Sequence, residues 1–394
     1  MPVVGAYRVE ARRIPRRGVG VGRIALIGNG WHPTLFREEV RALLGPVDTI
    51  HPRIVLAESK ASVLERISRA SLIESAIDSF CSIRGGRVTI DEIASQIGEW
   101  AESNIPEGTF AVRARRIGQG VGNISRREIE EKTGAIISDG TRRVDLESPE
   151  FEIVVILAGP EDTSSHWDDE EAGESVLWGI RDDLSNGSYI GISPTERPFF
   201  KPVTLDPRLA RLMVSLSYRG ETPSMVVDPF CGTGGIAIES SMTGIKVLAS
   251  DLDSRMVEGT RTNLEWANGA GDFTVKQLSA EMIHQKWGPV SGCSFVFDPP
   301  YGRNAWTSED GLDLFISTLS SAKEMCPDGT VCTMLPCSPK SVEGPVSEEL
   351  EVMGAKWGHL KTRIQQTGWE VIVNCPVRVH RSLSRLVVTC HPAD

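Results

Sequence analysis

Residues 225–251 read MVVDPFCGTGGIAIESSMTGIKVLASD, and this stretch decides the fold of the C-terminal half of the chain. Its first four residues form a short apolar strand, and the glycines at 232, 234 and 235 form a turn. Residues 235–243 and 245–249 then read as a helix and a second strand. Because glycine tolerates positive φ and lets a backbone approach a ligand closely, the turn is a candidate binding loop.

The alternation of strands and helices continues toward the C-terminus. The expected strands are 273–278, 294–298, 330–335, 370–375 and 386–390, and the expected helices are 256–267, 312–326 and 355–366. Alternating β and α elements imply an α/β fold with a doubly wound, mainly parallel sheet. In open sheets of this kind, ligands bind outside the carboxyl ends of the strands.

Residues 295–302, FVFDPPYG, place chemically active groups at that edge. Proline can neither donate to a ladder nor continue a central strand, so the chain must leave the sheet at Pro299. An acid (Asp298), exposed backbone carbonyls and the ring of Tyr301 therefore gather where the strand ends. Taken alone, the same pattern is also compatible with a plain strand-ending turn.

The glycine turn indicates a nucleoside ligand with a positive charge. It matches neither G-x-x-x-x-G-K-[ST] nor G-x-G-x-x-G, and the carboxylate of Asp228 would repel a phosphate. Asp228 would suit a cationic group, such as the amino group and sulfonium of S-adenosyl-L-methionine (SAM). Asp251, at the end of the second strand, can accept both ribose hydroxyls, whereas Asp253 is expected to cap the next helix. The alternative is a tight turn followed by a helix cap, and the pairing of turn and acid favours SAM.

The composition is ordinary for a globular protein. The chain has 394 residues, of which 40% are hydrophobic and 24% charged, and its formal net charge of -11 argues against binding nucleic acid through bulk charge. None of the eight cysteines forms a Cys-x-x-Cys pair, which argues against a zinc ribbon, and we expect no metal site. Scattered cysteines without a signal peptide predict a cytoplasmic protein with reduced thiols. No apolar run reaches the roughly 18 residues of a membrane helix.

The first 160 residues read as mixed α and β structure. The expected strands are 23–28, one or two within 47–59, a short one near 87–90, 109–115, 142–146 and 151–157, and the expected helices are 33–44, 61–81, 92–102 capped by Asp91, and 126–133. Ser125 and Glu128 predict a capping box for the last of these helices, and Gly134 its end. Residues 159–187 are polar and acidic, which is typical of a linker or surface excursion. Residues 188–193 predict a further strand.

Basic residues cluster in this half despite the acidic total. They are Arg113, Arg115, Arg116, Arg126, Arg127, Lys132, Arg142 and Arg143. Composition alone leaves open whether they form a solvated face or a phosphate-contacting surface.

Several motifs resemble a known family. The pair DPFCGTGG and DPPYG is similar to class I SAM-dependent methyltransferases that act on exocyclic or amide nitrogens. The flanking motifs RPFFKP (197–202), HPTL (32–35) and VHRSLSR (379–385) resemble the archaeal and eukaryotic tRNA guanine-10 N2-methyltransferases. The resemblance covers nearly the whole chain.

The family resemblance implies a domain organisation. It comprises a ferredoxin-like N-terminal α+β unit (1–65), a THUMP RNA-binding domain (66–160), a linker (161–200) and a Rossmann-like class I methyltransferase domain (201–394). The implied function is SAM-dependent methylation of the N2 amine of guanosine 10 of tRNA, once or twice. The need for a small activator protein, as in eukaryotic relatives, stays open.

The resemblance also implies roles for individual residues. Asp298 and the backbone carbonyl of Pro299 would accept the N–H hydrogens of the target nitrogen, with Tyr301 stacked on a flipped-out base. The cofactor would contact Asp228, Phe230, Gly232, Gly234, Asp251, Ser279 and Ala280. The substrate would contact Arg303, Arg113, Arg115, Arg126 and Arg142.

One position departs from the family pattern. The family usually has Asp-Ala after the third strand of the catalytic sheet, where the acid recognises the adenine amine, whereas this chain has Ser279-Ala280-Glu281. Ser279 could accept that hydrogen bond, or Glu281 could substitute for the missing acid.

Three other functions compete with this reading. Enzymes for guanosine 6 of tRNA resemble Asn-Pro-Pro-Tyr, so Asp298 favours position 10. A DNA adenine methyltransferase could share DPPY, but would not explain the N-terminal module. A non-catalytic tRNA-binding THUMP protein is disfavoured by the intact acids and glycines of the site.

Overall fold

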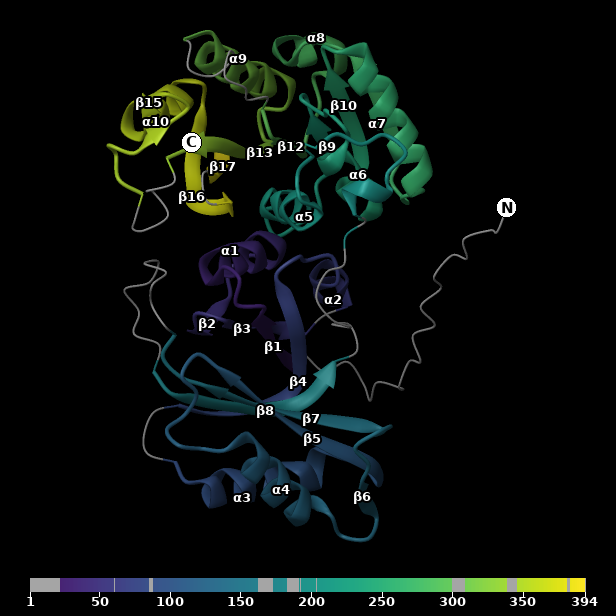
Figure 1. Cartoon of the computed structure of the whole chain (residues 1–394), viewed down its shortest axis with the longest axis vertical. Coiled ribbons are helices and arrows are strands. Elements are labelled where there is room, and N and C mark those ends of the chain that lie inside the picture. The colour runs from purple at the N-terminus through teal and green to yellow at the C-terminus, as the bar shows by residue number, and fades with distance from the viewer. Residues whose placement is uncertain are drawn as a thin grey trace.

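The computed structural model describes residues 22–59, 61–84, 88–161, 173–182, 191, 193–202, 204–299, 309–338, 346–380 and 383–393. These residues build two sheets, one in each half of an elongated molecule (Figure 1). None of the described helices is long and apolar enough to cross a membrane. The α/β fold expected from the sequence is confirmed.

The N-terminal sheet is continuous from residue 22 onward into the THUMP region. Its strand order is β2-β3-β1-β4-β8-β7-β5-β6. The strands are β1 (Gly22–Gly28), β2 (Asp48–His51), β3 (Ile54–Ser59), β4 (Ile73–Arg84), β5 (Gly108–Ile117), β6 (Arg142–Val144), β7 (Phe151–Ala158) and β8 (Ser175–Asp182). Since β4 pairs with both β1 and β8, it joins the first unit to the rest of the sheet.

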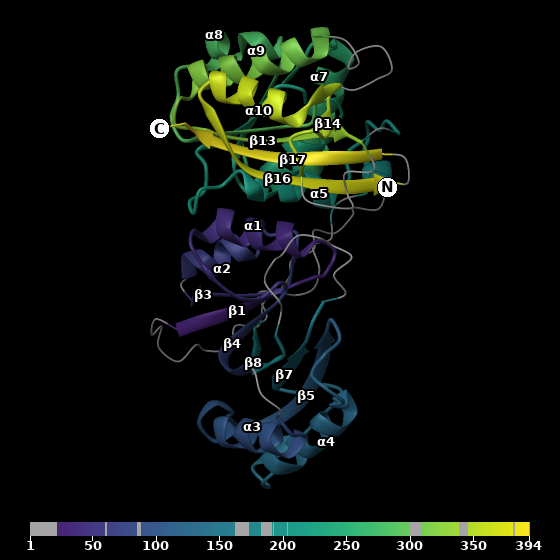
Figure 2. The ribbon, with the colours of Figure 1, turned by 90° about the vertical axis from the view of Figure 1, so that its left-hand side faces the viewer.

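Four helices flank this sheet. They are α1 (Pro33–Leu44), α2 (Ala61–Ile67), α3 (Ile90–Asn104) and α4 (Arg126–Ile137). Figures 1 and 2 show α1 and α2 between the sheet and the C-terminal half, and α3 and α4 at the far end of the molecule.

Four expectations for this half were wrong in detail. The short strand predicted near 87–90 is not found in its described residues, since Val88 and Thr89 lie in no strand and Ile90 begins α3. The helix predicted for 61–81 ends at Ile67, and β4 takes over at Ile73, because partner strands distant in sequence give the second part a ladder on both sides. Thr89, not Asp91, caps α3, in a reciprocal capping box with Glu92. The helix expected to stop at Gly134 runs on to Ile137, whose side chain is buried.

The acidic stretch 159–187 contains a strand rather than only a linker. β8 pairs with β4 and β7, and its Trp178 is 2% exposed. Residues 162–172 and the strand predicted for 188–193, apart from Gly191 and Ser193, lie outside the described residues.

The C-terminal sheet has the order β11-β10-β9-β12-β13-β14-β15, and β17 pairs with β13 and β16. Its strands are β9 (Met225–Asp228), β10 (Lys246–Asp251), β11 (Phe273–Gln277), β12 (Cys293–Phe297), β13 (Thr330–Cys337), β14 (Glu351–Val352), β15 (Ala355–Lys356), β16 (Trp369–His380) and β17 (Leu383–Pro392). The pairs among β11, β10, β9, β12 and β13 are parallel, as the sequence predicted. β17 is antiparallel to both β13 and β16, so β16 runs parallel to β12 and ends at the same edge.

Helices cover both faces of the C-terminal sheet. They are α5 (Pro207–Leu216), α6 (Gly235–Met242), α7 (Ser254–Ala267), α8 (Ile283–Trp287), α9 (Glu309–Met325) and α10 (Trp357–Gln366), with short 3-10 turns η2 (Pro194–Glu196) and η3 (Ala280–Met282). Figure 2 shows α9 and α10 on the outer side and α5 on the side that faces α1.

The two halves share one hydrophobic core. α1 packs against α5, and a single buried cluster contains Phe36 and Val40 of α1 together with Leu212 and Met213 of α5. The buried Arg211 of α5 pairs with Glu239 at 2.9 Å and donates to the carbonyl of Arg69 in the N-terminal half at 3.3 Å. Close-packed contacts of this kind fix the orientation of the N-terminal half relative to the C-terminal sheet.

Candidate active site at the carboxyl edge of the sheet

Three carboxylates stand at the ends of three neighbouring strands. Asp228 ends β9, Asp251 ends β10, and Asp298 follows β12. Because β10, β9 and β12 are adjacent and parallel, their carboxyl ends meet at one edge. The fold therefore brings together the acids that the sequence singled out 23 and 70 residues apart.

The glycine turn adopts the backbone that its sequence predicts. Gly234 has φ 83°, and a Cβ added there would lie 3.0 Å from Cγ2 of Thr260. Gly232 has φ 50°, and the nearest described atom to such a Cβ would be the carbonyl oxygen of Phe230, 3.9 Å away, so the described residues leave this side of the turn open. Only glycine adopts both conformations at little cost.

Asp251 fastens the turn to the next strand. Its Oδ2 accepts a hydrogen bond from the amide of Gly232 at 3.0 Å, and its Oδ1 accepts one from the amide of Asp253 at 2.9 Å. The side chain of Asp253 caps α7, as expected, by accepting from the amide of Arg255. A carboxylate has about four lone-pair positions, so Asp251 retains acceptor capacity for a ligand.

The site is strongly acidic. Burial raises the pKa of Asp228 well above its usual range, the amide of Phe230 opposes the rise, and the negative charges of Asp251 and Asp298 add to it. Burial raises the pKa of Asp298 to about 7, and the positive charge of Arg385 opposes that rise. The buried Oδ1 of Asp298 has no hydrogen-bond partner among the described residues. A buried acid whose pKa is raised further by two neighbouring carboxylates marks a site that fits a cationic ligand and repels a phosphate.

These observations test whether SAM suits the residues present. The open turn at Gly232 gives backbone access, Asp251 offers acceptors at the end of the second strand, and the acidic edge suits a sulfonium and an amino group. The residues therefore fit the cofactor that the methyltransferase domain implies.

A second layer of polar residues supports the turn, and the sequence reading gave it no role. The amide of Asn263 on α7 donates to the carbonyls of Thr233 and Phe199, each at 2.8 Å, and its oxygen accepts from the amide of Phe199 at 2.9 Å. The hydroxyls of Thr204 and Thr233 lie 3.1 Å apart. Asn263 is fully buried within a helix, and such a polar residue in a helix interior is the signal that could have marked it.

The residues expected at the adenine end lie beside the same edge. Ser279 follows β11 and precedes η3, Ala280 is buried, and the Ser279 hydroxyl lies 3.5 Å from Oε2 of Glu281. The ring of Phe230 packs 5.6 Å from that of Phe297, which makes it part of the apolar wall under the turn. Pro299 is buried next to Asp298, whereas Tyr301 and Arg303 lie outside the described residues.

The four arginines named as RNA contacts in the N-terminal half differ in their surroundings. Arg113 donates to the carbonyl of Leu146 at 2.6 Å, Arg115 pairs with Glu74 at 2.8 Å, and Arg142 lies 3.4 Å from Asp139. These three therefore have partners within the fold.

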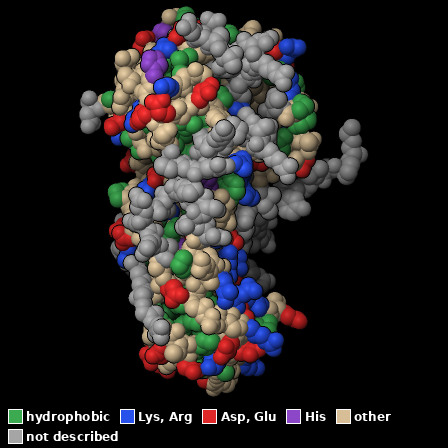
Figure 3. Space-filling model, turned by 60° about the vertical axis from the view of Figure 1, so that its left-hand side comes forward, with side chains coloured by type: hydrophobic (Ala, Val, Ile, Leu, Met, Phe, Trp, Pro, Cys, Tyr) green, Lys and Arg blue, Asp and Glu red, His purple; other side chains and the backbone are tan. Residues whose placement is uncertain are grey.

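Arg126 belongs to a different group. It lines a groove of about 730 Å³ at the start of α4 together with Arg116 and Arg127. Figure 3 shows Lys and Arg side chains gathered on this face of the lower half. The sequence reading named Arg126 as a substrate contact and placed Arg116 and Arg127 only in the wider basic cluster.

Comparison with known proteins gives two domain matches. Residues 194–366 match the family described as RMKL-like, methyltransferase domain, and residues 87–159 match the THUMP domain. Both matches agree with the modules that the sequence predicted.

Three curated proteins are similar over long stretches. The chain is 34% identical over 252 residues to the tRNA (guanine(10)-N2)-dimethyltransferase of Methanothermobacter thermautotrophicus, covering 63% of this chain and 67% of that protein. It is 30% identical over 288 residues to the protein of the same name from Pyrococcus abyssi, covering 73% and 74%. It is 25% identical over 244 residues to the tRNA (guanine(6)-N2)-methyltransferase of Thermus thermophilus, covering 59% and 63%.

Proposed function

The chain belongs to the tRNA (guanine(10)-N2)-dimethyltransferase family, and from this premise we propose that it methylates the exocyclic N2 amine of guanosine 10 in tRNA, once or twice. The enzyme class, a tRNA (guanine-N2)-methyltransferase, follows from the family. The position in tRNA and the residues that act are the content of the proposal.

One observation supports the chemistry above all others. Asp298 is a partly buried acid at the carboxyl end of β12, and its Oδ1, which is buried, has no hydrogen-bond partner among the described residues. A buried polar atom without a partner is costly unless a ligand satisfies it. An N–H of the target amine is such a partner, and the neighbouring backbone carbonyl of Pro299 would accept a second N–H.

The residues around the glycine turn would hold the cofactor. When bound, SAM supplies a methyl group activated by a positively charged sulfonium. The carboxylate of Asp228 would lie near its cationic end, and Asp251 would accept the ribose hydroxyls. Gly232 and Gly234 keep the backbone close enough for contact, and Ser279, Ala280 and Phe230 would line the adenine side.

Asp298 would both orient the amine and take its proton. The N2 lone pair is delocalised into the guanine ring, so a nearby acceptor that stabilises developing positive charge lowers the barrier. A pKa of about 7 for Asp298 suits this task, because a general base works best when its pKa lies near the working pH. Tyr301 would stack on the base once it has left its helix.

In this proposal the N-terminal half binds tRNA. The THUMP domain (66–160) and the preceding unit would hold the acceptor end, with Arg126 of the basic groove and Arg303 as substrate contacts. The shared core between α1 and α5 then sets the distance from these tRNA contacts to Asp298. Whether a small activator protein assists is an open part of the proposal.

Methyl transfer from labelled SAM to tRNA transcripts tests this function. A transcript with a G10–C25 pair should accept methyl groups, and one with an A10–U25 pair, which keeps the stem, should not. A third transcript, in which guanosine 6 is replaced and G10 kept, should react like the first. If only the guanosine 6 replacement abolished transfer, position 6 would be the target and the proposal would be wrong.

A further inference from the structure

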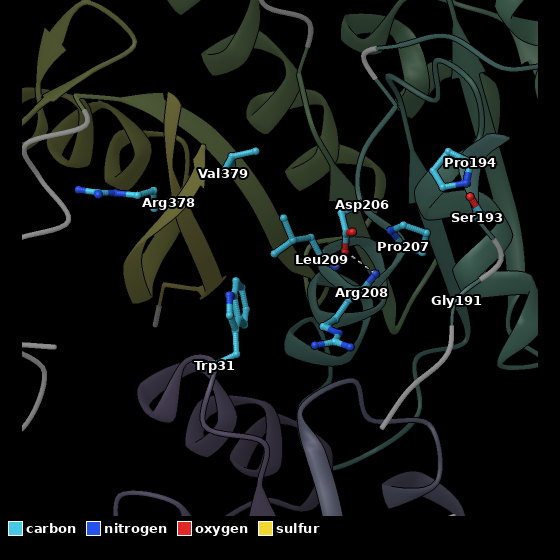
Figure 4. A pocket seen from close by; sticks show the side chains of 10 residues that line it. All are labelled: Trp31, Gly191, Ser193, Pro194, Asp206, Pro207, Arg208, Leu209, Arg378 and Val379. Carbon is cyan, nitrogen blue, oxygen red and sulfur yellow. Dashed lines mark hydrogen bonds between the residues drawn. The ribbon is translucent and has the colours of Figure 1, made fainter. Parts of the chain in front are cut away.

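A cavity of about 500 Å³ lies where the two halves of the molecule meet. Four segments of the described residues line it: the residue before the N-cap of α1, residues 191, 193 and 194, the start of α5 and the end of β16. Figure 4 shows Trp31 rising from the start of α1 and Arg208 coming from α5, while Arg378 points away from both. None of the roles described above uses this cavity.

The cavity lies on the catalytic side of the C-terminal sheet. β16 ends at the same edge as β12, and its residue Val377 pairs with Arg385, whose charge acts on Asp298. Val379, two residues further along β16, lines the cavity and is 43% exposed. An RNA that reaches from the THUMP half to Asp298 therefore has this cavity within the region it must cover.

Trp31 is held in place although its ring is exposed. The residue as a whole is 42% exposed, whereas its neighbour His32 contacts β16. Nε2 of His32 lies 3.4 Å from the carbonyl of Pro376 and 3.6 Å from Sγ of Cys375. The amide of Trp31 donates to the side chain of Asn29 at 3.0 Å. These contacts pre-organise an aromatic surface, which reduces the entropy lost when a ligand stacks on it.

The residues at the cavity favour a ligand that has both a negative charge and a flat ring. Asp206 is occupied in capping α5, since its Oδ1 accepts from the amides of Arg208 and Leu209 at 2.9 and 3.3 Å. Among the described residues, Arg208 donates to Asp206 through its backbone amide, and its guanidinium makes no ion pair or side-chain hydrogen bond. The cavity thus offers an indole face beside an arginine that is available for a phosphate.

We propose that this cavity holds one unpaired nucleotide of the tRNA substrate, with its base stacked on Trp31 and its phosphate paired with Arg208. The proposal rests on the proposed function, because it takes tRNA as the substrate. Unpaired bases stacked on aromatic side chains are the usual mode of RNA recognition outside helices. The cavity volume of about 500 Å³ lies within the range of pockets that enclose ligands of this size.

Steady-state kinetics with matched variants test the site. Trp31→Ala should raise KM for tRNA by about 10-fold or more, because stacking on one aromatic ring accounts for an effect of that size. The kcat value should stay unchanged, and Trp31→Phe, which keeps a stacking ring, should retain most of the affinity. Arg208→Gln should raise KM and weaken its salt dependence. Trp266→Ala is the matched control, since Trp266 of α7 is 41% exposed and does not line the cavity.

Photo-crosslinking identifies the nucleotide. Transcripts carrying 4-thiouridine either at position 8 or in the single-stranded 3′ end are irradiated with the wild-type enzyme, and crosslinked peptides are sequenced by mass spectrometry. A crosslink to the peptide containing Trp31 from one of the two supports the proposal and names the source. Wild-type methylation of G10 with an unchanged KM in Trp31→Ala would overturn this inference alone. Failure of the wild type to bind or methylate tRNA would overturn the proposed function as well.

Discussion

Arg385 on β17 and Asp298 after β12 are oppositely charged groups that act on each other inside the catalytic edge. Burial raises the pKa of Asp298 to about 7, and the guanidinium of Arg385 opposes that rise. Burial lowers the pKa of Arg385, and Asp298 opposes that change in turn. The balance sets the pH at which Asp298 becomes able to accept a proton.

Replacing Arg385 should move the pH dependence of activity. Without the positive charge, the pKa of Asp298 rises further, so the ionised form that the proposed mechanism needs appears only at higher pH. In Arg385→Gln the acid limb of kcat/KM should shift upward by about one pH unit, whereas Arg385→Lys should shift it less. The control is Arg363→Gln, which removes a charge paired with Asp313 on α9. Equal profiles for Arg385→Gln and the wild type would contradict an electrostatic role.

Asp298→Asn should lower activity and reduce the loss of stability with rising pH. Losing the acceptor and base should lower kcat by about 100- to 10,000-fold. Because the folded-state pKa lies above the unfolded value, Asp298 favours folding below about pH 4, and this contribution is lost as pH rises through about 7. The free energy of unfolding should therefore fall with pH more steeply in the wild type than in Asp298→Asn, by on the order of 2–4 kcal/mol in total.

Urea unfolding between pH 5 and pH 8 measures that difference. Asp313→Asn, at an exposed position, serves as the control and should follow the wild type. If Asp298→Asn lost stability in parallel with the wild type across this range, Asp298 would not carry the raised pKa.

Gly234→Ala should weaken cofactor binding, whereas Gly244→Ala should not. Both glycines have positive φ, 83° and 79°, so each substitution should cost about 1–2 kcal/mol of folding free energy. Only at position 234 would the new Cβ approach a neighbour closely, 3.0 Å from Thr260, and push the turn out of place. At position 244 the nearest atom is 4.0 Å away. Calorimetric titration with SAM measures the difference, and equal dissociation constants would show that the turn does not contact the ligand.

The C-terminal sheet could be read from the sequence because its signals are local. In residues 225–251, the strand, the glycine turn, the helix and the next strand follow one another without interruption. The residues at the ends of each element indicate where it begins and ends. The acids at the strand ends follow directly from this register. The positions of the acids could therefore be predicted where a single βα unit contained the strand, the turn and the acid.

The features that the sequence analysis predicted wrongly or missed depend on partners distant in sequence. β4 was expected to be helical, and it becomes a strand because β1 and β8 pair with it on its two sides. Asn263 supports the glycine turn through contacts with Phe199, 64 residues away, and its place in a helix interior signals a partner without identifying which residue that partner is. Similarly, the sequence could not show that Arg115 pairs with Glu74 while Arg126 lines an open groove.

That contrast between two arginines predicts different phenotypes. Arg126→Gln should raise KM for tRNA and reduce the slope of log affinity against log salt by about one, because a phosphate contact is lost. Arg115→Gln should lower the melting temperature with a smaller effect on KM, since its charge is paired inside the fold. Filter binding at several salt concentrations, together with thermal unfolding, separates the two. Reversed phenotypes would mean that RNA contacts β5 rather than the groove.

The coupling between the two halves should depend on Arg211. This buried arginine pairs with Glu239 of α6 and donates to the carbonyl of Arg69, so it joins the catalytic sheet to the N-terminal half. Arg211→Gln leaves Glu239 buried without its charged partner, which should lower the free energy of unfolding by about 3–5 kcal/mol. Arg127→Gln breaks a pair with Glu131 that is exposed to solvent and should leave stability unchanged.

The same variant tests the placement of the two halves. Because the shared core sets the distance between the proposed tRNA-binding surface of the N-terminal half and Asp298, Arg211→Gln should also raise KM for tRNA at temperatures below its melting point. Loss of stability with an unchanged KM would show that the pair supports the fold without fixing the relative placement of the two halves.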